Sequence, residues 1–219
     1  MKHKETLKNI LDEKRQAFNA TADSERIRIY EEGITAVALS GVLERARHVG
    51  DRAEDFVLPN AAGKDVRLRD YLKKGPVVLT WYRGSWCPYC NLTLSRLQKE
   101  LPAFKEEGAN LIAVTPEKPD KSMTTVEQYN LEFEVLSDLQ NSVAREYGLI
   151  FNLTDEVARI YEESFQFHQY YDHERKELPL AATYIIDTEG IIRYAFIDED
   201  YRNRAEPAEI LEELKKLRH

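Results

Sequence analysis

Residues 77–90 read VVLTWYRGSWCPYC and contain both of the cysteines in the chain. The apolar run Val77–Tyr82 is typical of a short strand that is buried on both faces of a sheet. After this stretch, apolar side chains recur at helical spacing, at Leu94, Leu97, Leu101 and Phe104. The pattern therefore predicts a buried strand that turns into a helix at the cysteine pair.

Strand-like and helix-like runs alternate around this stretch, which is the signature of β-α-β units on a central sheet. Further strands are expected within residues 56–68, 110–114, 134–136 and 183–196, the first and last of these ranges being hairpins. Further helices are expected over residues 122–129, 143–147 and 207–217. Pro102 is expected to kink or split the helix that follows the cysteines. The sequence thus predicts an α/β fold, with a central sheet flanked by helices.

Residues 1–49 have a different pattern. Apolar side chains recur at helical spacing from Leu7 to about Arg47, with a polar break over residues 19–24. This pattern predicts two or three helices, and Gly50 marks the change in composition. We therefore expect an N-terminal helical arm over 1–49, packed on the main domain over 50–219 or on a partner.

The composition excludes several classes of protein. The net charge is −8 and no Lys/Arg-rich run stands out, which argues against nucleic-acid binding. The N-terminus lacks the apolar stretch of a secretory signal, and no segment approaches the ~18 apolar residues of a membrane span. We expect a cytoplasmic protein with neither a nucleic-acid nor a membrane partner.

The two cysteines are separated by two residues, and a disulfide that closes so short a loop adds little stability. Redox chemistry and metal binding are the functions that such a pair serves. A zinc site would need two further ligands, and the five histidines show no paired ligand spacing. The sequence therefore favours a redox-active pair, with no metal and no cofactor.

Cys87 is expected at the start of a helix, beside unpaired backbone N–H groups and the positive end of the helix dipole. Such a position lowers the pKa of a thiol from about 8.5 toward 7, so that thiolate is abundant at neutral pH. Pro88 suits the first helical position, and Cys90 follows within disulfide reach. We favour Cys87 as the exposed nucleophile, open to solvent, and Cys90 as the resolving thiol; the reverse order remains open.

Four segments carry a resemblance to a known family: Gly50–Pro59, Val77–Tyr82, Trp86–Cys90, and Thr183–Asp187 with Gly190. In this order and spacing they resemble the peroxiredoxin-like branch of the alkyl hydroperoxide reductase / thiol-specific antioxidant (AhpC/TSA) family. The resemblance implies a thioredoxin-like fold with a central mixed β-sheet, and reduction of hydroperoxides by a cysteine thiolate. The Cys-Pro-Tyr-Cys tetrad also resembles the glutaredoxin motif.

The chain departs from the family pattern Pro-x-x-x-Thr-x-x-Cys. Laid on it without gaps, Arg83 takes the place of the proline, Cys87 that of the threonine and Cys90 that of the reactive cysteine. The arginine that the family carries later in the chain corresponds here to Ala181. In this register Cys90 attacks and Cys87 resolves. Arg83 is either a solvated loop residue or a charge that stabilises the thiolate.

The leading functional hypothesis is reduction of hydroperoxides, with a Cys87–Cys90 disulfide recycled by a thioredoxin- or glutaredoxin-type donor. Supporting roles are expected for Arg83, Trp86, Pro88 and Tyr89, with Trp86 as the wall of a groove rather than a buried side chain. One alternative is a thiol–disulfide oxidoreductase with little peroxidase activity. Another is a non-catalytic redox-sensing module, in which oxidation changes how the arm or the aromatic segment 161–171 docks a partner. A homodimer is a further possibility.

Overall fold

The computed structural model describes residues 6–171 and 176–217 of the chain. Its centre is a five-stranded sheet in the order β5-β4-β3-β8-β9. These strands are β3 (Val77–Trp81), β4 (Asn110–Thr115), β5 (Glu134–Ser137), β8 (Thr183–Ile186) and β9 (Ile192–Phe196). β3, β4 and β5 run parallel, whereas β8 is antiparallel to both β3 and β9. The sheet is therefore mixed, and the predicted α/β class is confirmed.

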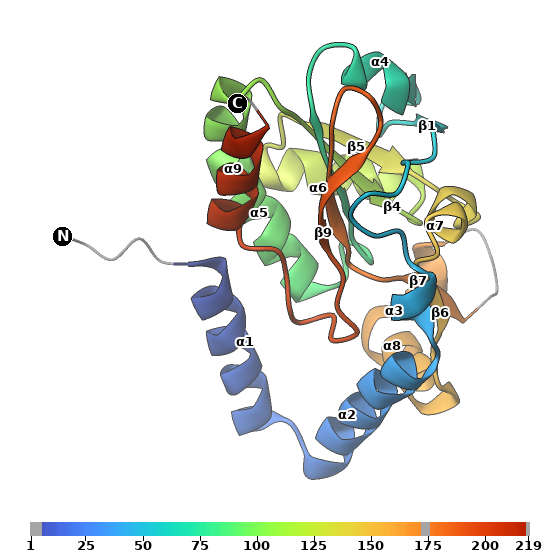
Figure 1. Cartoon of the computed structure of the whole chain (residues 1–219). Coiled ribbons are helices and arrows are strands. Elements are labelled where there is room, and N and C mark those ends of the chain that lie inside the picture. Colours follow the sequence, from blue (N-terminus) through green and yellow to red (C-terminus); the bar gives the residue numbers. More distant parts are fainter. Residues whose placement is uncertain (1–5, 172–175, 218–219) are drawn as a thin grey trace.

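Helices cover this sheet. In Figure 1, α5 (Pro88–Glu106) and α9 (Pro207–Lys216) lie side by side, and they contact β4 and β8–β9 respectively. α6 (Pro119–Tyr129) packs against β5, and the short helices α4 (Leu68–Leu72) and α7 (Ser142–Glu146) lie in the connections. α5 continues through Pro102. Pro102 therefore does not split the helix, because burial of the apolar face of α5 outweighs the loss of one backbone hydrogen bond.

Two small sheets flank the main one. β1 (Val57–Pro59) pairs with β2 (Asp65–Arg67), which confirms the predicted hairpin within residues 56–68. β6 (Ile150–Asn152) pairs with β7 (Glu177–Pro179), and α8 (Asp155–Phe165) and the 3-10 turn Phe167–Gln169 lie between them in the chain. The sequence analysis did not predict β6, α8 or β7. The aromatic segment 161–171 lies on the end of α8 and the turn after it.

The N-terminal segment forms α1 (Leu7–Thr21), α2 (Ser24–Leu39) and α3 (Val42–Arg45), as the apolar spacing predicts. The polar break becomes a helix start, because the Asp23 carboxylate accepts a hydrogen bond of 2.8 Å from the Arg26 N–H. α1 packs on α5 and α2 packs on α8, so the N-terminal helices pack against later helices of the same chain (Figure 1). The division of the chain into two domains at residue 50 stays a prediction.

Within the described ranges, no helix is long and apolar enough to cross a bilayer.

Candidate active site

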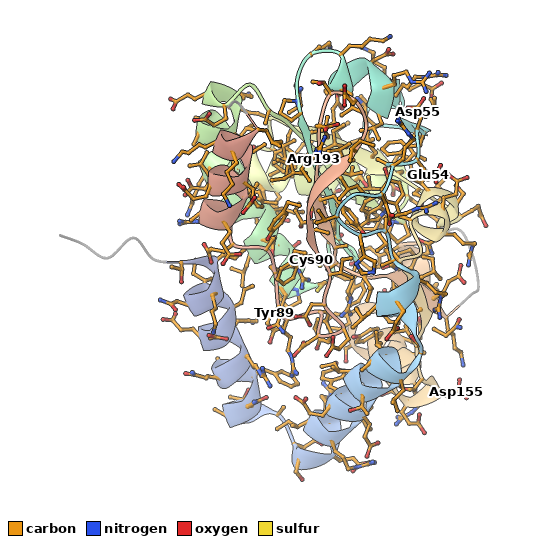
Figure 2. All side chains as sticks on the ribbon, viewed as in Figure 1. Glu54, Asp55, Tyr89, Cys90, Asp155 and Arg193 are labelled. Atoms are coloured by element: carbon orange, nitrogen blue, oxygen red, sulfur yellow. The ribbon has the colours of Figure 1, made fainter. Side chains whose placement is uncertain are left out.

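The cysteine pair lies where β3 gives way to α5, as the sequence predicts. Cys87 is the residue immediately before the helix, Pro88 opens its first turn, and Cys90 lies within that turn. Figure 2 shows Tyr89 and Cys90 at the end of α5 that is nearer the N-terminal helices. The two sulfurs are not bonded to each other; both cysteines are free.

Both cysteines are buried: Cys87 is 1% exposed and Cys90 is 0% exposed. The prediction that the sulfur of Cys87 is open to solvent is therefore wrong. The reason is that the N-terminal helices, α8 and the loop before α9 close over the start of α5, which a local sequence pattern does not reveal. Access is by way of a cavity of about 130 Å³ that Cys87 borders. The residues that line it are Lys14, Phe18, Tyr30, Arg83, Trp86, Cys87, Pro88, Tyr89, Tyr161, Phe165, Tyr201 and Arg202.

Of the two cysteines, Cys90 is the one whose surroundings favour the negatively charged thiolate. Burial works against ionisation there, but a hydrogen bond from Cys87, the charges of Arg204 and Arg83, and the Arg83 backbone amide together hold the pKa of Cys90 well below its ordinary value. Nη2 of Arg204 lies 3.4 Å from Sγ of Cys90. Burial and the neighbouring Cys90 raise the pKa of Cys87. This charge distribution differs from the expectation that the first thiol of the motif is the anion.

Arg83 is a buried side chain, 2% exposed, so its interpretation as a solvated loop residue is wrong. Its Nη2 donates a hydrogen bond of 2.6 Å to the Tyr161 hydroxyl, and its guanidinium lies 4.0 Å from the centre of the Tyr201 ring and 4.8 Å from that of Trp86. Its Nε is buried without a hydrogen-bond partner among the described residues. A cation enclosed by aromatic faces exerts a strong field on the nearby sulfurs, because little water screens it.

Trp86 is buried at 7% exposure, which contradicts the expectation that it is not buried, although its ring also lines the cavity. Its Nε1 donates a 2.6 Å hydrogen bond to the Tyr171 hydroxyl, which in turn donates one of 2.6 Å to the Arg83 carbonyl. The aromatic segment 161–171 thus packs on the residues just before the motif. Tyr161 and Phe165 lie 4.9 Å and 5.3 Å from Trp86, measured between ring centres.

Pro88 and Tyr89 form the part of the cavity wall that α5 contributes. The Tyr89 ring meets the Tyr201 ring edge-on, with 5.6 Å between their centres. All four supporting residues named from the sequence therefore line this one cavity. What they do there stays a prediction.

Two charged residues near the pair were missed by the sequence analysis. Arg204 lies 114 residues after Cys90 in the chain, and nothing in its local sequence marks it. Glu117 follows β4 and is 0% exposed; its Oε1 accepts hydrogen bonds of 2.7 Å from the Ser85 N–H and 2.8 Å from the Ser85 hydroxyl. Burial raises the pKa of Glu117 to about 7. The Pro-Glu-Lys-Pro sequence around Glu117 gave no signal for such a role.

Ala181, which corresponds in position to the family arginine, carries no charge. The positive charge near the sulfurs comes from Arg83 and Arg204 instead. In the part of the chain that the structure describes, no group of three or more His, Cys, Asp or Glu side chains is placed to hold a metal ion.

Solved structures show the same fold. Peroxidoxin BcpB from Mycobacterium tuberculosis superposes with a TM-score of 0.62 at 23% identity, over 78% of this chain and 98% of that one. Peroxiredoxin 6 of Arenicola marina gives a TM-score of 0.64 at 16% identity, over 79% of this chain and 74% of that one. The thioredoxin-like fold that the resemblance implied is confirmed.

Curated relatives match about half of the chain. A protein named putative peroxiredoxin bcp, from Buchnera aphidicola subsp. Schizaphis graminum, is 33% identical over 46% of this chain and 63% of its own length. One named thiol-disulfide oxidoreductase ResA, from Bacillus thuringiensis subsp. konkukian, is 31% identical over 49% of this chain and 61% of its own. In both cases the match spans less than two thirds of the relative.

The family model described as AhpC/TSA family matches residues 49–195. This range contains the main sheet, apart from the last residue of β9, and both cysteines. Because the match covers well over half of the sequence, the chain belongs to the AhpC/TSA family.

Proposed function

We propose that the protein is a thiol-dependent oxidoreductase that reduces hydroperoxides with the Cys87–Cys90 pair. The observation that carries this proposal is the pair itself: two free cysteines at a helix start, beside Arg83 and Arg204, with Cys87 bordering a cavity of small-molecule size. Similarity to a relative named peroxiredoxin supports the same chemistry.

Cys87 is the attacking thiol in this proposal, because it lines the cavity by which a substrate arrives. In the resting pair the negative charge lies on Cys90, so Cys87 reacts from the form of the pair in which its proton has moved to Cys90, a form that the nearby charge of Arg83 stabilises. The Cys87 thiolate then attacks one peroxide oxygen: an S–O bond forms, the O–O bond breaks, and the alkoxide takes the proton of the Cys90 thiol and leaves as alcohol. The Cys90 thiolate next attacks the sulfur of the Cys87 sulfenic acid, and the S–O bond breaks to release hydroxide, which takes a proton from solvent to become water. In total, two thiols and one hydroperoxide give one disulfide, one alcohol and one water.

Arg83 and Arg204 stabilise the negative charge on sulfur and oxygen during these steps. Arg204 contacts the sulfur that carries the charge in the resting pair. Arg83 lines the cavity, and its buried Nε has no hydrogen-bond partner among the residues that the structure describes, so it supplies a donor for the peroxide oxygens as charge develops on them. The disulfide is then reduced by a thioredoxin- or glutaredoxin-type donor, two electrons at a time.

A thiol–disulfide oxidoreductase with little peroxidase activity is the second candidate, favoured by the similarity to a protein named ResA. The burial of both cysteines weighs against it, because a protein disulfide must reach the attacking sulfur directly.

The test compares the purified protein with Cys87→Ser and Cys90→Ser in hydroperoxide consumption and in insulin disulfide reduction. We expect peroxide turnover in the wild type alone, and one sulfenic acid, trapped by dimedone and located by mass spectrometry on Cys87, in Cys90→Ser. Sulfenate on Cys90 in the Cys87→Ser variant, at the wild-type rate, would reverse the roles. Insulin reduction without peroxide turnover would establish the second candidate.

A further inference from the structure

Five of the twelve described residues that line the cavity beside Cys87 come from parts of the chain that the family model does not match. Lys14, Phe18 and Tyr30 come from α1 and α2, and Tyr201 and Arg202 from the loop before α9. These five positions all lie outside residues 49–195. The matched region supplies the sulfur, and the unmatched segments supply much of the enclosure. The part of the cavity wall that the N-terminal helices and the loop before α9 form is therefore a feature of this chain that lies outside the family match.

The walls are aromatic. Phe18 and Tyr30 pack with 5.6 Å between their ring centres, and Tyr30 lies 5.9 Å from Tyr161 in the same measure. Trp86 and Phe165 continue the wall on the side of α8. Such rings favour an aromatic guest, because offset and edge-to-face ring contacts stabilise more than the burial of area alone.

The size of the cavity limits the guest. Its volume is about 130 Å³. An apolar protein cavity of roughly 150 Å³ is large enough to bind benzene. A single aromatic ring therefore already fills this space, whereas a long acyl chain leaves most of its length outside it.

Charge orients the guest. None of the twelve described residues that line the cavity is acidic, and three are basic: Lys14 of α1, Arg202, whose charge is paired with Glu31 and Asp200, and Arg83, whose charge acts on both sulfurs. Electron-rich oxygens are thus favoured at the end of the cavity where the sulfur lies, with the organic group against the rings of the N-terminal helices.

We propose that this cavity binds the organic group of a compact aromatic hydroperoxide, and that Phe18 and Tyr30 of the N-terminal helices select for it. The proposal rests on the proposed peroxidase function and names its substrate class. The bonds that form and break are those given above, with the aryl-substituted alcohol as the product that leaves.

The test measures kcat/KM of the full chain with cumene hydroperoxide, hydrogen peroxide and linoleic acid hydroperoxide, using one chemical reductant throughout. We expect cumene hydroperoxide to be preferred over each of the others by about tenfold or more, which is the factor expected for burial of one aromatic ring. Phe18→Ala should lower kcat/KM for cumene hydroperoxide by about tenfold more than it lowers kcat/KM for hydrogen peroxide. Phe18→Leu should restore part of the loss.

Leu39→Ala is the matched control, because Leu39 belongs to the same N-terminal helices, is 82% exposed and does not line the cavity. It should leave all three rates unchanged. A cumene-to-hydrogen-peroxide ratio near one, a preference for linoleic acid hydroperoxide, or an equal loss of all rates in Phe18→Ala would overturn the inference and leave the peroxidase function standing. If the wild type turns over no hydroperoxide, the proposed function fails and this inference fails with it.

Discussion

Arg204 and Glu117 are far from the cysteine motif in the sequence and close to it in the fold. Arg204 contacts Cys90, whereas Glu117 binds Ser85, two residues before Cys87. A thiolate in a poorly hydrated site depends on such neighbours, because it has lost most of its solvation by water.

Arg204→Met should raise the pKa of the pair by about one unit or more, because it removes a cation in contact with the thiolate and keeps a side chain of similar length. The pKa is measured from the thiolate absorbance at about 240 nm as a function of pH, or from the rate of alkylation by iodoacetamide. Arg193→Met is the control: Arg193 pairs with Asp187 on the surface. An unchanged titration in Arg204→Met would show that Arg204 does not hold the charge.

Glu117→Gln should change how stability depends on pH. Burial raises the pKa of Glu117 to about 7 from its ordinary 4.5, so between these pH values the folded protein holds a proton that the unfolded chain has lost. Stability from this group is fully present below pH 4.5, falls as the pH rises to about 7, and is then lower by about 3 kcal/mol.

Urea unfolding at pH 5 and pH 7.5 checks this. The free energy of unfolding should fall more steeply over this interval in the wild type than in Glu117→Gln. Glu13→Gln, at an exposed position of α1, should behave as the wild type does. Equal slopes in all three proteins would mean that Glu117 is ionised throughout.

At the residue scale, the local sequence was enough to place Cys87 and Cys90, because a strand, a turn and a helix start are encoded within a few residues of the motif. It was not enough to predict their burial or the position of the charge. Those depend on Arg204, Arg83 and the covering helices, which meet the motif only through the tertiary fold.

At the element scale, close backbone contact fixes the junction between the N-terminal helices and the body. The Arg47 N–H donates a hydrogen bond of 3.0 Å to the Tyr147 carbonyl, and Gly148 follows in a left-handed conformation with φ of 71°. A Cβ at Gly148 would lie 2.1 Å from the carbonyl oxygen of Arg45. Only glycine fits both requirements.

Gly148→Ala should therefore lower the free energy of unfolding by about 2 kcal/mol or more, since left-handed backbone strain and a clash with backbone add together. Chemical denaturation gives the value. Gly63→Ala is the control: its φ is 77°, but nothing lies within 4 Å of its Cβ position. If Gly148→Ala lowered the free energy of unfolding no more than Gly63→Ala does, only the left-handed backbone strain would matter. The close approach to the Arg45 carbonyl would then be relieved without loss of stability.

Periodicity predicted the elements of the main sheet well, because each buries a regular apolar face. It missed α8, although Thr154 caps that helix by accepting a hydrogen bond from the Val157 N–H. The helical spacing of Val157, Ile160 and Tyr161 is short, and it runs directly into the dense aromatic residues that begin at Tyr161, so the pattern does not stand out as a helix. β6 and β7 are three residues each, too short for an alternating pattern to stand out.

At the scale of the whole molecule, an ion pair and two hydrogen bonds connect the N-terminal helices to residues near the end of the chain. Arg202 is 6% exposed and binds Glu31 of α2 at 2.7 Å and Asp200 at 2.7 Å. The Glu206 carboxylate accepts hydrogen bonds of 3.1 Å from the N–H groups of Leu7 and Lys8, the first residues of α1. Both sets of contacts hold α1 and α2 in position over the cavity beside Cys87.

The double variant Glu31→Gln, Glu206→Gln should loosen α1 and α2 without unfolding the sheet. Removing the negative charge from the carboxylate that caps α1 and from one partner of a buried cation costs about 1–3 kcal/mol in total, enough to raise the open population of these helices by about fivefold or more. Hydrogen exchange followed by mass spectrometry should show faster exchange in peptides from α1 and α2 and unchanged exchange in β3 and β4. Uniformly faster exchange over the chain would mean that these contacts stabilise the whole fold instead.

The enclosure of both sulfurs also decides what oxidation does to the oligomeric state. A bond between two chains needs sulfurs about 2 Å apart. The chain has only two cysteines, at 1% and 0% exposure, so neither can approach a second copy while the helices stay closed. Oxidised protein should therefore migrate as a monomer on a non-reducing gel, even at high concentration, and any homodimer it forms is held together without covalent bonds.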